Sequence, residues 1–79
     1  MFRAFVQLEK VEDVKRFVAL CNEVPFAVDL LAGEFVVDAK SIIGIFSLDL
    51  SQKVALRAAC EGEEAGAFAE KIREFLVES

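Results

Sequence analysis

The 79-residue sequence contains no histidine, no tryptophan and no tyrosine, and only one proline and one methionine. Without histidine, the chain lacks a frequent ligand of zinc and haem and the commonest general base, so we expect no metal site and no cofactor. The two cysteines, Cys21 and Cys60, are far apart in the sequence and form no C-x-x-C pair. Both occupy apolar positions in the pattern described below. We therefore interpret them as buried free thiols of a cytoplasmic protein.

Long apolar runs are also missing, because no segment reaches the roughly 20 residues of a membrane span. The first residues, MFRAFVQLEK, lack the apolar stretch of a signal peptide. A formal charge of −5 at pH 7 argues against direct binding of nucleic acid. No nucleophile–base pair and no phosphate-binding glycine loop is visible, so we expect no enzyme. Apolar residues make up 56% of the chain, including eight phenylalanines. That composition indicates a core for a single domain over residues 1–79.

The spacing of apolar residues changes along the first half of the chain. Residues 2–8 alternate between apolar and other side chains, which predicts a strand. In residues 11–21 the apolar positions recur at every third or fourth residue, which predicts an amphipathic helix that ends before Pro25. Residues 26–31 and 34–38 are two apolar runs joined by a short turn, so they predict a hairpin.

The second half of the chain predicts one more strand and one more long helix. Residues 53–60 alternate again, and a helical stripe runs from Ala65 to Leu76 behind Glu63 and Glu64. Four strands covered by helices indicate an α/β two-layer (α+β) sandwich with a mostly antiparallel sheet. The pattern alone would also suit a ferredoxin-like fold, so it leaves the topology open.

The segment DAKSIIGIFSL, residues 38–48, separates the hairpin from the last strand. As a strand it would place Gly44 in the middle of a ladder, where glycine weakens pairing. As a short helix it begins at Ser41, a favoured N-cap that can accept a hydrogen bond from the amide of Ile43 or Gly44. One turn then places Ile42, Ile43 and Phe46 around most of the helix, so part of this set faces water. The alternative is that these side chains simply close the core.

Residues 39–48, AKSIIGIFSL, closely resemble the regulatory-serine segment N-A-K-S-I/L-M/L-G-V/I-M/L-S-L of HPr. HPr is the small phosphocarrier protein of the bacterial sugar phosphotransferase system. The segment RFVALCN and the acidic, alanine-rich C-terminal helix ending in EFL extend the resemblance over nearly the whole chain. The resemblance implies the HPr-like open-faced sandwich, a four-stranded antiparallel sheet with three helices on one face, in the order β-α-β-β-α-β-α.

The same resemblance identifies a functional residue that this sequence lacks. In the family, a histidine in a G-L/I-H-A-R-P-A motif before the first helix carries the phosphoryl group. Counting back from Phe17 places Lys10 at the histidine and Glu12 at the motif's arginine. Glu12 and Asp13 also put negative charge at the start of the helix, where it would repel a phosphoryl group. The resemblance therefore implies an HPr-like protein without histidine phosphotransfer.

What the resemblance retains is the serine segment. Ser41 matches the serine that HPr kinase/phosphorylase phosphorylates with ATP in the family, after which the protein acts as corepressor for a LacI-type regulator. A phosphate there would lie at the positive end of a helix, beside Lys40. Ile42, Ile43 and Phe46 match the family's apolar docking patch, and Lys40 is expected to contact the partner with them. The implied function is regulatory and non-catalytic: docking to a transcription regulator or a metabolic enzyme in carbon catabolite regulation.

A second interpretation keeps the fold and changes the role. The chain would be an HPr-fold protein-binding module whose partner is unrelated to sugar transport and ignores phosphorylation. The erosion of the motif around Lys10 favours it, because one functional site of the family is already gone. Ser41 would then be an N-cap and nothing more. Phe46 could be an exposed docking residue or a part of the core.

Overall fold

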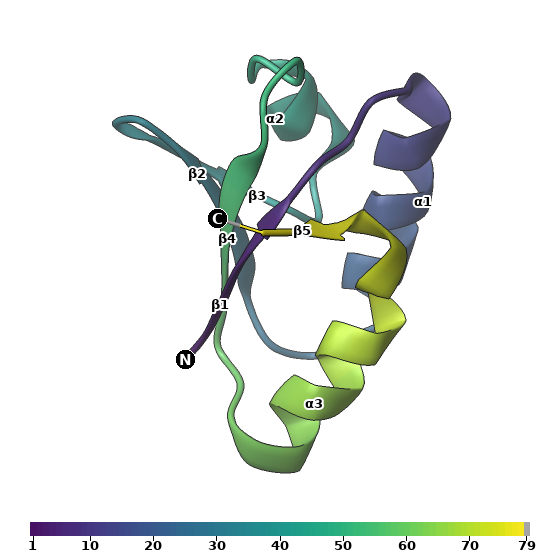
Figure 1. Cartoon of the computed structure of the whole chain (residues 1–79), viewed down its shortest axis with the longest axis vertical. Helices are drawn as coiled ribbons and strands as arrows, with labels where there is room; N and C mark the ends of the chain where they lie inside the picture. The colour runs from purple at the N-terminus through teal and green to yellow at the C-terminus, as the bar shows by residue number, and fades with distance from the viewer. Residues whose placement is uncertain (79) are drawn as a thin grey trace.

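The five strands form one antiparallel sheet in the order β3-β2-β4-β1-β5. The computed structural model describes residues 1–78. In chain order the elements are β1 (Phe2–Val6), α1 (Val11–Asn22), β2 (Val28–Ala32), β3 (Phe35–Asp38), α2 (Ile42–Phe46), β4 (Val54–Ala58), α3 (Gly62–Lys71), the 3-10 helix η1 (Arg73–Phe75) and β5 (Leu76–Val77). Helices α1 and α3 stand together on one side of the strands (Figure 1).

The central strand β4 shows how the alternating sequence makes a two-sided sheet. Val54, Leu56 and Ala58 point toward the helices and are buried, whereas Ala55 and Arg57 between them are only half-buried. Successive side chains of a strand point to opposite faces. The core therefore lies between one face of the sheet and the helices.

Aromatic side chains join the helices to this core. Phe17 of α1 meets Phe75 of η1 edge to face, with ring centroids 5.5 Å apart. Phe68 of α3 meets Phe26 and Phe2 in the same way, at 5.3 Å and 5.9 Å. Such pairs add to the burial of large apolar surfaces, so the phenylalanines supply much of the core of this small protein.

The structure confirms the predicted fold class and element order, with one correction at the C-terminal end. The predicted helix through Leu76 is wrong, because α3 ends at Lys71 and the chain continues as η1 and a fifth strand. Strand β5 pairs with the side of β1 that β4 leaves open, and the Gln7 amide donates to the Phe75 carbonyl at 2.9 Å. Backbone groups at a sheet edge need such partners. The four-stranded sheet of the prediction therefore has a fifth, two-residue strand.

The turn between β2 and β3 requires a glycine. Gly33 has a φ of +61°, in the left-handed region that other residues enter at a cost. This confirms the predicted hairpin. The prediction of buried free cysteines is also confirmed for Cys21 and Cys60. Burial raises the pKa of the Cys21 thiol to about 12, although the positive charge of Lys40 acts in the opposite direction.

None of the helices in the described residues 1–78 is long and apolar enough to cross a membrane.

Candidate functional site

Ser41 is the N-cap of helix α2, as the sequence predicts. Ser41 has an extended backbone, with φ −108° and ψ 112°, and its Oγ accepts a hydrogen bond from the Gly44 amide at 3.2 Å. Its carbonyl accepts the first helical hydrogen bond, from the Ile45 amide at 3.2 Å. These contacts are those of a serine N-cap. The Ser41 residue is itself exposed.

The apolar residues of α2 divide into an inner and an outer pair. Ile45 is fully buried and Ile42, three residues earlier, is half-buried, so these two side chains attach the helix to the core. Ile43 is 81% exposed and Phe46 is 45% exposed, again three residues apart. Residues three apart share a face of a helix. We call the exposed residues Ser41, Ile43 and Phe46 the α2 surface.

This division refines the expectation for the docking patch. The sequence predicts a docking patch of Ile42, Ile43 and Phe46. In the structure Ile42 is half-buried, whereas Ile43 and Phe46 are exposed. Sequence reasoning missed Ile45, the residue that fixes the rotation of the helix. The signal was present, because Ile42 and Ile45 have helical spacing toward one side.

Lys40 connects α2 to the end of α1. Its ammonium donates to the Val24 carbonyl at 2.8 Å, and its own carbonyl accepts from Asn22 Nδ2 at 3.1 Å. Its amide donates to Asp38 Oδ1 at 2.9 Å. Lys40 is half-buried by these contacts. The structure therefore gives Lys40 a structural role beside Ser41 and keeps its ammonium engaged at the loop after α1.

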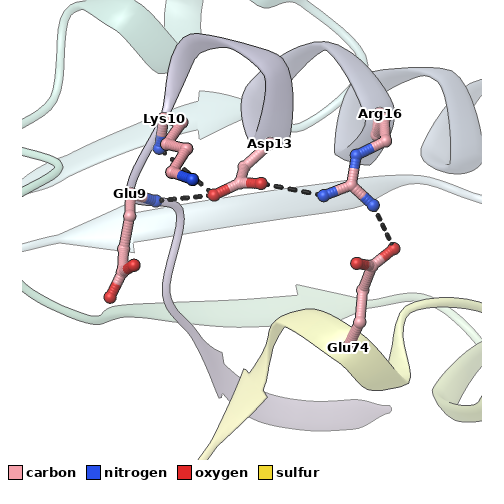
Figure 2. A network of polar contacts seen from close by, with 5 residues as sticks. All are labelled: Glu9, Lys10, Asp13, Arg16 and Glu74. Atoms are coloured by element: carbon pink, nitrogen blue, oxygen red, sulfur yellow. Dashed lines mark hydrogen bonds and ion pairs between the residues drawn. The ribbon is translucent and has the colours of Figure 1, made fainter.

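A network of polar contacts surrounds the start of α1, where Lys10 is the N-cap residue (Figure 2). A lysine side chain has no acceptor with which to cap a helix. Instead, Asp13 Oδ2 accepts hydrogen bonds from the amides of Glu9 and Lys10, both at 3.2 Å. Asp13 Oδ1 accepts one from Arg16 Nη2 at 2.8 Å, and Arg16 Nη1 donates to Glu74 Oε1 at 2.5 Å.

These contacts hold Asp13 in its charged form. Burial on its own would raise the pKa of this carboxyl group. The hydrogen bonds from the Arg16 guanidinium and from the Lys10 and Glu9 amides outweigh burial, so the pKa of Asp13 is lowered. A carboxylate of the protein therefore occupies two backbone amides immediately before α1. Within residues 1–78, no group of three or more acidic or thiol side chains gathers to hold a metal ion.

Together, the one-sided sheet and the serine-capped α2 define a small α+β open-faced sandwich. The family model described as "PTS HPr component phosphorylation site" matches residues 12–78. The chain belongs to the HPr family. This confirms the resemblance seen in the serine segment. No curated protein matches the sequence.

Solved structures agree with this assignment. HPr-C-His from Thermoanaerobacter tengcongensis is 23% identical, with a TM-score of 0.75, over 94% of this chain and 89% of that one. The histidine-containing phosphocarrier protein of Mycoplasma is 16% identical, with a TM-score of 0.67, over 92% and 86%. These two likenesses show the fold. The catabolite repression protein Crh of Bacillus subtilis is 25% identical, with a TM-score of 0.63, over 92% of this chain and 88% of that one.

Proposed function

We propose that this protein is a regulatory, non-catalytic member of the HPr family that has given up histidine phosphotransfer. In this proposal Ser41 is phosphorylated, and the α2 surface docks to a transcription regulator or a metabolic enzyme that controls carbon metabolism. The observation that carries the proposal is the position of Ile43, 81% exposed, on the same short helix that Ser41 caps. An exposed isoleucine beside an exposed serine suits a surface that a partner covers.

Both the sequence and the structure support the proposed loss of the carrier function. The chain has no histidine to accept a phosphoryl group. In addition, the amides of Glu9 and Lys10, which could help to hold an incoming anion, already bind the Asp13 carboxylate. A second negative group would meet this one at short range and be repelled. The protein's own carboxylate therefore already uses two of the amides beside the start of α1.

Phosphorylation of Ser41 is supported by its accessibility. The hydroxyl oxygen attacks the γ-phosphorus of ATP, the bond from that phosphorus to the ADP oxygen breaks, and the hydroxyl proton passes to a base of the kinase. The product carries nearly two additional negative charges and three acceptor oxygens. The Gly44 amide, 3.2 Å from Ser41 Oγ, is placed to donate to a phosphate oxygen. The modification would thus change the charge of the α2 surface and leave Ile43 and Phe46 available.

Docking is supported by the apolar side chains and by the relatives. Phe46, at 45% exposure, is an aromatic side chain of the kind that anchors interfaces. Crh is described as a catabolite repression protein, and we extend that regulatory role to this chain. The HPr family as a whole acts through contacts with other proteins, so a protein partner is the expected ligand of the α2 surface.

The test of the modification is intact-protein mass spectrometry after incubation with HPr kinase/phosphorylase and ATP. We expect one phosphoryl adduct on the unmodified sequence and none on Ser41→Ala. Ser47→Ala is the matched control, because Ser47 is exposed at the other end of α2 and its Oγ donates to the Gly44 carbonyl at 2.5 Å. Equal labelling of Ser41→Ala, or no labelling of the wild type, would reject phosphorylation at this position.

The test of docking uses calorimetric titration of a purified LacI-type regulator with the phosphorylated protein. Ile43→Ser should weaken binding by about tenfold or more, because truncation of an interface anchor costs roughly 1–2 kcal/mol or more. Binding that is equally tight with and without the phosphate would favour the second interpretation, a module that ignores phosphorylation. Ser41→Ala should lose about 1 kcal/mol of stability through its missing cap, so a circular dichroism spectrum must accompany each variant.

A further inference from the structure

The face of the sheet opposite the helices carries a continuous row of apolar side chains. The register places Val36 of β3 beside Leu31 of β2, Leu31 beside Ala55 of β4, Ala55 beside Phe5 of β1, and Phe5 beside Val77 of β5. We call these five residues the apolar row. Val36 and Val77 at its ends are 54% and 39% exposed, and the three between them are half-buried.

In the described part of the chain no helix covers the apolar row, and the Lys53 ammonium lies over the Phe5 ring. Helices α1 and α3 lie on the other side of the strands (Figure 1). Phe5, Leu31 and Ala55 line a groove that extends toward Lys53. They also line a second groove, which includes Val77 and continues to Ala69 of α3 on the helix side. One apolar residue from every strand in a single line is more than the scattered exposed side chains that surfaces normally carry.

A second row on the same face is charged, with its two signs in different halves. Asp29 of β2 is paired with Arg57 of β4 at 3.0 Å, and Asp38 of β3 lies beside Asp29. Arg3 of β1 lies beside Arg57 on the other side. Arg3 is exposed and forms no ion pair with any group in residues 1–78. The acidic half of this row is therefore on β3 and β2, and the basic half is on β4 and β1.

We propose that this open face is the interface of a homodimer in which two copies pack face to face. The two-fold axis runs parallel to the strands, in the plane between the two sheets and directly over the central strand β4. Rotation about this axis places each residue on one side of β4 opposite the residue on the other side. Phe5 then faces Leu31 of the second copy, Val36 faces Val77 of the second copy, and the two Ala55 residues meet at the axis. Sheets that pack in this way keep their strands nearly aligned.

The distribution of charge on this face favours a second copy of the chain as the partner, and it favours this axis over others. Rotation brings Arg3 opposite Asp29 of the second copy, twice in each dimer. The two Arg57 side chains meet the axis, but each leans toward the Asp29 of its own chain, so they separate. Lys53 is also drawn away from the axis, since its ammonium donates to the Glu78 carbonyl at 3.1 Å and lies 5.1 Å from the Phe5 ring centroid. The face is thus complementary to itself.

A different arrangement of the same two faces is disfavoured. An axis across the strands would also superpose the two apolar rows. It would, however, set Arg57 against Lys53 of the second copy, and Asp38 against Glu34. Like charges at an interface oppose association. With the axis along β4, the apolar rows meet and Arg3 faces Asp29 of the second copy.

The size of the face predicts a weak dimer. Five strands at about 4.8 Å spacing and five residues at about 3.4 Å give a projected face of about 400 Å². Stable interfaces bury about 800 Å² on each partner. The net charge of −5 on each copy opposes association further unless salt screens it. The dimer should therefore form and dissociate rapidly.

Sedimentation equilibrium of the unphosphorylated protein tests the proposal, at about 0.15 M salt, where the screening length is about 8 Å. Protein concentrations should run from about 10 µM to about 1 mM, the range in which so small an interface dissociates. We expect the average mass of the wild type to rise above the 8.7 kDa of one chain as concentration increases. Leu31→Lys should stay monomeric throughout, and Arg3→Glu should weaken the dimer about tenfold.

Ile43→Lys is the matched control, since it adds the same charge to the α2 surface; its dimerisation should equal that of the wild type. Arg3→Glu changes an exposed side chain, so it keeps the test valid if Leu31→Lys does not fold. A wild type that stays monomeric at every concentration overturns the proposal. Loss of the dimer in Ile43→Lys would also overturn it, as would a dimer that persists for hours after dilution, as strand exchange produces. Ser41 takes no part in this test, so its outcome is separate from that of the proposed function.

Discussion

The rotation of α2 can be tested by truncating its one fully buried side chain. Ile45 is 0% exposed, so Ile45→Ala removes three buried carbon atoms and leaves a cavity. Isoleucine-to-alanine changes in cores cost about 2–5 kcal/mol. We expect about 3 kcal/mol here, because a five-residue helix can settle partly into the space. For a domain this small, such a loss lowers the melting temperature by about 12–24 °C.

The matched control is Ile43→Ala, the same chemical change on a side chain that is 81% exposed. Its effect should stay within about 0.5 kcal/mol, as for most surface substitutions. Because the chain has no tryptophan and no tyrosine, urea unfolding is best followed by far-ultraviolet circular dichroism. If Ile43→Ala were as destabilising as Ile45→Ala, the helix would be rotated and the α2 surface would lose its main apolar residue. That result would refute the basis of the docking proposal.

Three further predictions concern backbone strain, acid stability and thiol reactivity. Gly33→Ala should destabilise the protein by about 1–2 kcal/mol, because Gly33 has a left-handed φ. Gly66→Ala should stabilise it by about 0.5–1 kcal/mol, because Gly66 lies on α3 with open space around it. Urea unfolding of the two variants measures both changes. The lowered pKa of Asp13 means that its carboxylate stabilises the fold above the ordinary pKa of 3.8, and that this contribution disappears as pH falls through the lowered value. Unfolding midpoints measured from neutral pH down into that acid range should therefore fall less for Asp13→Asn than for the wild type. Cys21, with a pKa of about 12, and Cys60, buried as well, should react with an aromatic disulfide reagent only after denaturation, which absorbance would record.

Most strands could be predicted because alternation in the sequence becomes alternation of burial in the sheet. In β4 the apolar residues Val54 and Leu56 are buried, and Arg57 beside them is not. The prediction of a helix through the C-terminal residues was wrong because two backbone geometries share the same spacing of buried residues. Ile72 and Phe75 continue the helical spacing of α3 and are both buried, yet the intervening backbone has already changed to a 3-10 turn. Spacing cannot distinguish these cases, since either geometry brings both side chains to the core.

The candidate site was predictable in its N-cap and in its apolar character. Ser41 predicted a capping hydrogen bond from the amide of Ile43 or Gly44, and in the structure the donor is Gly44. The contact of Lys40 with the Val24 carbonyl depends on how two loops meet, and nothing local in the sequence encodes it. The ion pair of Arg16 with Glu74 joins residues 58 positions apart, which no local pattern reveals. The apolar row on the open face likewise needs the register of every strand.

The Asp13 network has a consequence for the history of the protein. We expect that Lys10→His alone would not recreate a phosphocarrier, because the incoming phosphoryl group would still face the Asp13 carboxylate. Removing that carboxylate first would uncap α1 and detach Arg16, which also holds Glu74 near the C-terminal end. Each single step back would therefore be unfavourable by itself. In the proposed function, the Asp13 carboxylate at this position therefore makes the carrier role difficult to regain by one mutation at a time.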